Sequence, residues 1–238
     1  MTNTAPRRYV ALGDSVSIAL YPEWDARERL GRPVSGLGAA DLLVRNNDEL
    51  WPEFEGQDLT TLVPGLEYDN LAEDGGTMTD VLGDQLKRLK TSGADLVTLT
   101  VGGNDLLELL ASVPSGSIAD GVGRLIVTYR GMVSRIRDVV PSATIVLTTV
   151  YDPTDGTGIF PGSPPLPIDL LTPLNDAIRE AAASHPRLAL ADVHRHFLGH
   201  GLSAPVADRW YWSGSIIEPS MKGASEVRRL WLHSLAQT

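Results

Sequence analysis

The hydrophobic positions of this chain form five short continuous runs, separated by stretches in which apolar residues recur at helical spacing. Runs that are apolar at consecutive positions are typical of strands buried on both faces of a parallel sheet. We therefore predict five parallel strands, at Arg8–Gly13, Leu66–Ala72, Asp95–Val101, Thr144–Thr149 and Arg187–Val193.

The stretches between the runs predict helices, because their apolar residues lie three and four positions apart. The predicted helices are Gly38–Leu50, Thr79–Lys90, Ile118–Val140, Asp169–Ser184 and Pro219–Leu235. Pro219 suits the first helical position of the last one. The alternation of strand and helix predicts a three-layer α/β/α sandwich with right-handed crossovers. No linker or repeat divides the chain, so we expect a single domain spanning residues 1–238.

Three connections are too long and irregular for simple turns: Tyr21–Gly36, Tyr151–Ile168 and His194–Ile217. Each follows the C-terminal end of a predicted strand, so all three should gather over one edge of the sheet as lids or pocket walls. The alternative is that they are solvent-exposed insertions. The aromatic run at 210–212 fits either a stacking wall of the pocket or packing of its loop onto the body.

Charge and composition exclude several classes of function. The 238 residues hold 20 Lys and Arg against 30 Asp and Glu, a net charge of −10, which argues against nucleic acid or an anionic membrane as partner. Arg228–Arg229 is an isolated basic pair that we expect to be solvated. Cysteine is absent, which excludes disulfides and thiolate chemistry. No apolar run approaches the ~18 residues of a membrane span, so we expect a cytoplasmic protein, with export after signal removal as the alternative.

Polar turns follow the first three predicted strands and form the best candidate site. Gly-Asp-Ser-Val-Ser at 13–17 brings the Ser15 hydroxyl to the sheet edge where open α/β sheets place their ligands. Gly75, after the second strand, lets a backbone N–H approach a substrate oxygen. The amide of Asn104, after the third, can donate a second hydrogen bond to that oxygen. If the first strand lies between the other two, Ser15 is a nucleophile beside an oxyanion hole.

These turns resemble three of the four signature blocks of the SGNH, or GDSL, hydrolase superfamily. The blocks are Gly-Asp-Ser-Val-Ser, Asn-Leu-Ala-x-x-Gly-Gly-Thr and Gly-Gly-Asn-Asp, in the family's order. The resemblance implies a flavodoxin-like five-stranded parallel sheet of order 2-1-3-4-5. It also implies Ser15 as nucleophile and an oxyanion hole made of the Ser15 N–H, the Gly75 N–H and the Asn104 side chain. The expected activity is hydrolysis of a small-molecule carboxylic ester through an acyl-enzyme, with no metal or organic cofactor.

The chain departs from the family in the fourth block. The family places Asp-x-x-His-Pro just before its last helix, and that histidine accepts the serine proton. Here the aligned residues are Ser-Ile-Ile-Glu-Pro at 215–219. Glu218 therefore stands in the place of the histidine and Ser215 in the place of the aspartate.

Four interpretations of this substitution are open. Glu218 can itself be the base, if burial raises its pKa from the ordinary value of about 4.3. A loop histidine can supply the base instead, and His200, between two glycines, has more backbone freedom than His194 or His196. The site can also be a degenerate pocket that binds an ester without cleaving it, or Glu218 can merely cap the last helix. An acyl-enzyme shielded from water would make the protein an acyltransferase. The three histidines lack a carboxylate ligand and helical spacing, so we expect no metal site.

Overall fold

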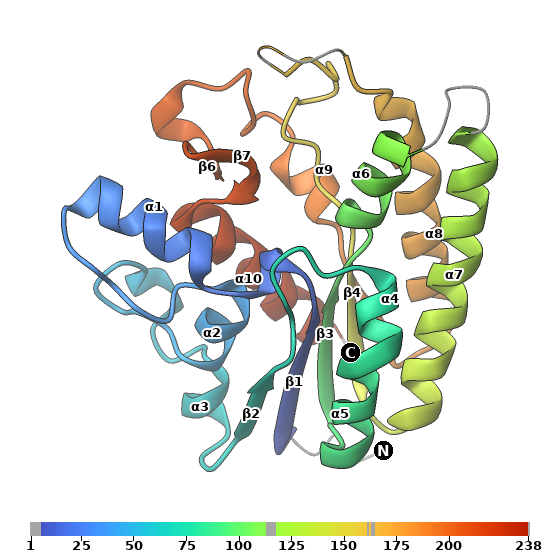
Figure 1. Cartoon of the computed structure of the whole chain (residues 1–238). Coiled ribbons are helices and arrows are strands. Elements are labelled where there is room, and N and C mark those ends of the chain that lie inside the picture. Colours follow the sequence, from blue (N-terminus) through green and yellow to red (C-terminus); the bar gives the residue numbers. More distant parts are fainter. Residues whose placement is uncertain (1–5, 113–117, 161, 163–164, 238) are drawn as a thin grey trace.

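The computed structural model of this protein describes residues 6–112, 118–160, 162 and 165–237. Its centre is a five-stranded sheet of order β2-β1-β3-β4-β5 in which every neighbouring pair is parallel (Figure 1). The strands are β1 (Arg8–Gly13), β2 (Glu67–Asn70), β3 (Leu96–Thr100), β4 (Thr144–Thr148) and β5 (Leu188–Ala191). The predicted strands and the predicted strand order are confirmed.

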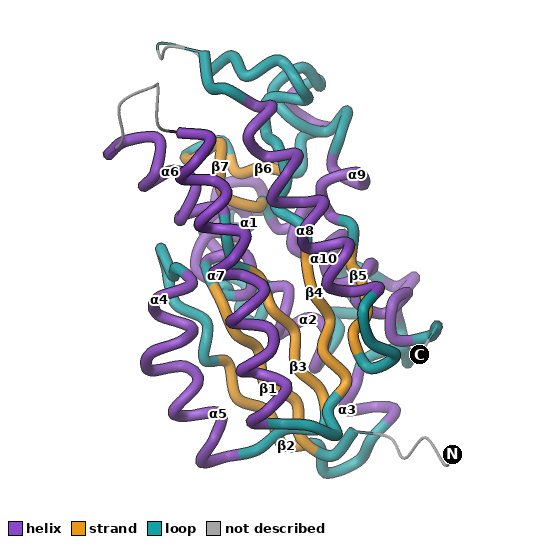
Figure 2. Tube along the Cα trace, turned by 90° about the vertical axis from the view of Figure 1, so that its right-hand side faces the viewer, coloured by secondary structure: helices purple, strands orange, loops and turns teal. Residues whose placement is uncertain are grey.

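Helices cover both faces of the sheet, as Figures 1 and 2 show. One face carries α1 (Leu20–Leu30), α2 (Ala39–Val44) and α10 (Met221–Leu235). The other face carries α4 (Met78–Asp80), which continues through a π-helical turn (Val81–Gln85) into α5 (Leu86–Ser92), together with α7 (Ile118–Val139) and α8 (Leu171–Ala183). The remaining α-helices of the described residues are α3 (Leu59–Leu62), α6 (Gly103–Ser112) and α9 (Val193–Phe197). Every helix in these ranges is too short or too polar to cross a lipid bilayer.

The side chains of β1 show why the sheet needs both helical layers. Tyr9 and Ala11 pack into the core beneath α2 and α10, whereas Val10 and Leu12 pack into the core on the α5 and α7 side. All four are completely buried. Because successive side chains of a strand point to opposite faces, a continuous apolar run contributes to two cores at once. Each large side chain buried this way stabilises the fold by roughly 1.5–3 kcal/mol.

The structure corrects several local predictions. The connection at 21–36 is largely the helix α1, whose buried residues are only Pro22, Asp25 and Ala26. Such a helix has no apolar stripe that periodicity could detect. The predicted helix at 38–50 is shorter, because α2 ends at Val44. The helix α6 was not predicted.

The start of the last helix also differs from the prediction. Pro219 is the final residue of β7 (Ser215–Pro219), which forms an antiparallel hairpin with β6 (Tyr211–Trp212). Ser220 caps α10 by accepting a hydrogen bond from the Gly223 N–H at 3.1 Å. Glu218 therefore lies on a strand, and the interpretation of Glu218 as a helix cap is wrong.

Arg228 was expected to be solvated and is instead completely buried. Its guanidinium carbon lies 3.6 Å from the centre of the Phe54 ring, and its Nη1 donates to Asn46 Oδ1 at 2.8 Å. Burial lowers its pKa to about 10. The charge is tolerated because aromatic faces and amide oxygens replace water around it. Arg229, the other member of the pair, is half-buried.

Candidate active site

Ser15 lies where β1 gives way to a 3₁₀ turn (Ser15–Ser17) at the carboxyl edge of the sheet. Asp14 caps this turn by accepting the Val16 N–H at 3.1 Å, and its own N–H donates to the Thr100 carbonyl of β3 at 2.9 Å. These bonds fix the backbone on both sides of the serine. Burial raises the Asp14 pKa to about 7, and the charge of Glu218 adds to this shift. Ser15 itself is 6% exposed.

The two other predicted turns flank Ser15, because β1 lies between β2 and β3. Gly75 adopts a left-handed φ of +71°, which favours glycine. A Cβ on Gly76 would lie 2.4 Å from the Gly13 carbonyl oxygen, so glycine is needed for the close approach of this turn to the end of β1. Asn104 Nδ2 donates to the Gly76 carbonyl at 3.0 Å, which ties the turn after β3 to the turn after β2. One N–H of that amide remains for a ligand.

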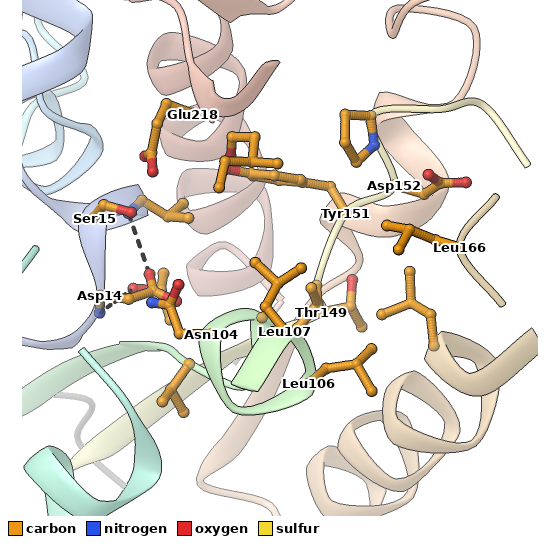
Figure 3. Close-up of a pocket in the computed structure, with 18 of the residues that line it drawn as sticks. Asp14, Ser15, Asn104, Leu106, Leu107, Thr149, Tyr151, Asp152, Leu166 and Glu218 are labelled. Atoms are coloured by element: carbon orange, nitrogen blue, oxygen red, sulfur yellow. Dashed lines mark hydrogen bonds between the residues drawn. The ribbon is translucent and has the colours of Figure 1, made fainter. Parts of the chain in front are cut away.

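Glu218 reaches the same place from the β6–β7 hairpin. Figure 3 shows its carboxyl group directed towards Ser15, on the side opposite Asn104. Burial raises its pKa to about 7, while the nearby Ser15 hydroxyl opposes the shift and the charge of Asp74 adds to it. In the part of the chain that the structure describes, its buried Oε2 has no hydrogen-bond partner. This oxygen is therefore available to accept a proton.

Two contacts from remote elements hold the strand that carries Glu218. The hydroxyl of Tyr151, just after β4, donates to the Ile217 carbonyl at 2.7 Å. On the other side, Asp25 of α1 accepts the Met221 N–H at 3.0 Å, at the start of α10. Tyr151 and Asp25 are positioning residues that the sequence analysis missed, since no local signal links them to β7.

The structure does not bring the candidate histidines to Ser15. The ring of His200 stacks on Trp210, with centroids 3.6 Å apart, and His196 bonds Glu226 Oε2 at 2.8 Å. His194 is half-buried, and burial lowers its pKa. None of the three lines the pocket beside Ser15. Within the described ranges, no group of three His, Cys, Asp or Glu side chains is suited to hold a metal ion.

A cavity opens beside Ser15, bounded by the turn after β1, α6, the loop after β4, the start of α8 and β7 (Figure 3). Its walls are mainly apolar, and six of the side chains that form them are Leu106, Leu107, Leu110, Phe160, Leu166 and Leu171. Residues 161, 163 and 164 of the loop after β4 lie outside the described residues. Of the three connections predicted to form lids or pocket walls, this loop and the end of the connection at 194–217 line the cavity, whereas the connection at 21–36 does not. The leucine spacing after Asn104 was a usable signal for α6 as a pocket wall.

The aromatic run before β7 packs onto the body and does not line this cavity. Trp210 and Tyr211 are buried in the core, and Trp212 lies against Tyr21 and Trp24 of α1. Of the two predicted roles, packing of the loop is therefore the one observed.

Comparison with known proteins identifies the family of this chain. A model of the GDSL-like lipase/acylhydrolase family matches residues 11–224. The chain belongs to this family. Three of the four signature blocks and the strands β2 to β5 lie inside the matched range, which begins within β1. No curated protein matches the sequence.

Solved structures share the fold of this GDSL-family chain along nearly its whole length. A protein named as a GDSL-like lipase, from Parabacteroides merdae, has a TM-score of 0.65 at 15% identity, over 97% of this chain and 96% of its own. Phospholipase A1 from Streptomyces albidoflavus has a TM-score of 0.59 at 24% identity, over 97% and 98%. The acetylxylan esterase Axe2 from Geobacillus stearothermophilus has a TM-score of 0.61 at 16% identity, over 96% and 94%. At these identities the likeness establishes the fold.

Proposed function

We propose that this GDSL-family protein is a serine esterase that uses Ser15 as nucleophile and Glu218 as general base. The observation that carries the proposal is the buried Glu218 carboxyl, which faces the Ser15 hydroxyl with a pKa raised to about 7. A carboxylate of ordinary pKa is a weak base at neutral pH, whereas a pKa near the working pH suits a general base. Membership of a lipase/acylhydrolase family supports the ester-cleaving part of this proposal.

The proposed reaction runs in two halves. Ser15 Oγ attacks the ester carbonyl carbon while Glu218 takes the hydroxyl proton, and the tetrahedral oxyanion is stabilised by the Ser15 and Gly75 N–H groups and the Asn104 amide. The intermediate collapses to an acyl-serine as Glu218 returns the proton to the leaving alcohol. Glu218 then takes a proton from a water molecule as the water oxygen attacks the acyl carbonyl carbon. The second intermediate breaks its bond to Ser15 Oγ, to which Glu218 returns the proton, and the carboxylic acid is released.

The apolar cavity beside Ser15 is the proposed place of the acyl chain. Leu166 lies at the end of this cavity away from Ser15 (Figure 3). Replacing Leu166 by tryptophan fills that end, so we expect kcat/KM for an octanoyl ester to fall about tenfold and that for the acetyl ester to stay within about twofold. The measurement is the rate with a series of p-nitrophenyl esters.

The matched control for this change is Ile159→Trp, in the same loop. Ile159 is 60% exposed and does not line the cavity, so its replacement should leave the chain-length profile unchanged. An equal loss on short and long esters in Leu166→Trp would contradict the assignment of the cavity to the acyl chain.

The proposed function is tested by turnover of p-nitrophenyl butyrate by the wild-type protein and by Ser15→Ala, from about pH 5 to about pH 9. Turnover that depends on Ser15 supports the esterase. Equal rates for the two proteins at every pH would refute it, and would leave a pocket that binds esters without cleaving them.

A further inference from the structure

On the other side of Ser15, away from the acyl cavity, three aromatic rings and a carboxylate form a cluster of Tyr21, Trp24, Asp74 and Trp212. The Tyr21 hydroxyl donates to both Asp74 oxygens, at 3.0 and 3.1 Å. The Tyr21 ring lies 5.4 Å from Trp24 and 5.7 Å from Trp212, and the two indoles are 5.4 Å apart. None of the four side chains lines the acyl cavity. The cluster joins α1, the turn after β2 and the β6–β7 hairpin.

This cluster borders the groups that would act on the ester. Asp74 immediately precedes Gly75, one of the proposed oxyanion donors. Its charge adds to the rise of the Glu218 pKa that burial causes. Burial and the hydrogen bond to Asp74 raise the pKa of Tyr21 to about 12, and the charges of Glu218 and Asp74 add to this shift. An ester with its carbonyl at Ser15 and its acyl chain in the cavity must direct its alcohol to the opposite side. The helix α1 and the β6–β7 hairpin, which carry three of the four side chains, lie on that side in Figure 1, whereas α6 and α8 of the acyl cavity lie on the other.

Carboxylates are the charged groups that act on the titratable residues of this side, whereas Arg29 and Arg209 line a separate pocket beside Trp212. The charged groups that shift the pKa values of Asp14, Tyr21 and Glu218 are all carboxylates. Asp74 is exposed and shares its hydrogen bonds with a phenol, so its negative charge is not neutralised by that contact.

The aromatic part of the cluster favours a cationic ligand, as the carboxylate of Asp74 does. Trp24 is 45% exposed, so part of its surface is open to a ligand. Aromatic faces beside a carboxylate attract ammonium groups, and quaternary ammonium ions above all. The rings contact one another, so a cation would rest against the cluster and not between its members.

On the basis of the proposed esterase function, we propose that this cluster is the alcohol subsite and that it selects esters of cationic amino alcohols. Choline esters are of this class, because their quaternary ammonium group lies on the alcohol side, two carbons beyond the ester oxygen. When the intermediate collapses, the carbon–oxygen bond to this alcohol breaks and the alcohol leaves with the proton that Glu218 returns.

The test compares two esters of equal shape and different charge, choline butyrate and 3,3-dimethylbutyl butyrate. Each kcat/KM is divided by the rate of hydroxide-catalysed hydrolysis of the same ester, which removes the difference in intrinsic reactivity. We expect the wild-type protein to prefer the cationic ester by about tenfold, and Asp74→Asn to reduce this preference by about fivefold. Added salt should weaken the preference as well.

Asp84→Asn is the matched control for charge. Asp84 is an exposed carboxylate in the π-helical turn between α4 and α5, and its removal changes the net charge by the same amount. This variant should keep the wild-type preference. Equal loss in both variants would overturn the assignment to Asp74, because it would show an effect of overall charge.

Failure of this inference differs from failure of the proposed function. If both esters are cleaved equally fast after correction, and Ser15→Ala is inactive, the cationic subsite is refuted while the esterase stands. If Ser15→Ala cleaves both esters as fast as the wild-type protein, the esterase itself is refuted and the subsite with it.

Discussion

Replacement of Ser15 by alanine is expected to lower kcat/KM for p-nitrophenyl butyrate at least about 10³-fold, because removing a nucleophile abolishes the covalent path and leaves only binding and the oxyanion hole. The fold should be retained, since the change deletes one oxygen from a turn whose backbone is held by Asp14 and Thr100. The measurement is kcat/KM of the purified Ser15→Ala variant for p-nitrophenyl butyrate, compared with that of the wild-type protein.

A second readout locates the nucleophile directly. An aryl fluorophosphonate should add one phosphonyl group to the wild-type protein, seen by mass spectrometry, and none to Ser15→Ala. Ser17→Ala is the matched control, because Ser17 lies two residues away in the same turn and its hydroxyl is hydrogen-bonded to Thr100 Oγ1 at 2.8 Å. Labelling that persists in Ser15→Ala and disappears in Ser17→Ala would show that the nucleophile is Ser17 and not Ser15.

Replacement of Glu218 by glutamine is expected to lower kcat/KM by about 10²- to 10⁴-fold, the usual contribution of a general base. Glutamine preserves the shape of the side chain and cannot accept the proton. In the wild-type protein only the ionised carboxylate acts, so kcat/KM should fall about tenfold per pH unit below the Glu218 pKa of about 7 and level off above it. The residual kcat/KM of Glu218→Gln should not fall in this way as the pH is lowered.

His200→Ala is the control for the competing assignment of the base. His200 stacks on Trp210 away from Ser15, so this variant should keep wild-type kcat/KM and the wild-type pH profile. A larger loss in His200→Ala than in Glu218→Gln would show that the histidine is the base. If neither change lowers the rate tenfold, both assignments are wrong.

The same pKa shift has a consequence for stability. The folded-state pKa of Glu218 is raised above its unfolded value of 4.5, so the folded protein holds this proton more tightly. Ionising the buried carboxyl therefore lowers the free energy of unfolding. This loss is absent below pH 4.5, grows as pH rises and is complete above about 7. Glu218→Gln carries no charge there, so its free energy of unfolding at pH 8 should exceed that of the wild-type protein by about 2–3 kcal/mol. Urea unfolding at pH 8 and at pH 4 measures the difference, which should vanish at the lower pH.

Much of the fold could be predicted from the sequence because its signals are local. Continuous apolar runs such as that of β1 mark strands buried on two faces, and the family turns fix the strand order through the resemblance. The placement of Gly75 and Asn104 beside Ser15 follows from that order alone. The helix α1 escaped prediction because its buried face includes Pro22 and Asp25, and burial of a charged residue has no periodic signature.

The sequence by itself determined the sheet, its carboxyl edge and the three turns around Ser15, since neighbouring residues and glycine geometry specify them. Only the tertiary structure decided which titratable side chain faces the serine. Glu218 and His200 were both open candidates, and the choice depends on the β6–β7 hairpin, which is held by Tyr151 from 66 positions away and by an Asp25–Met221 bond across 196 positions. Burial by these remote elements also raises the Glu218 pKa. A pKa reflects everything packed around a group, so residues adjacent in the chain cannot specify it.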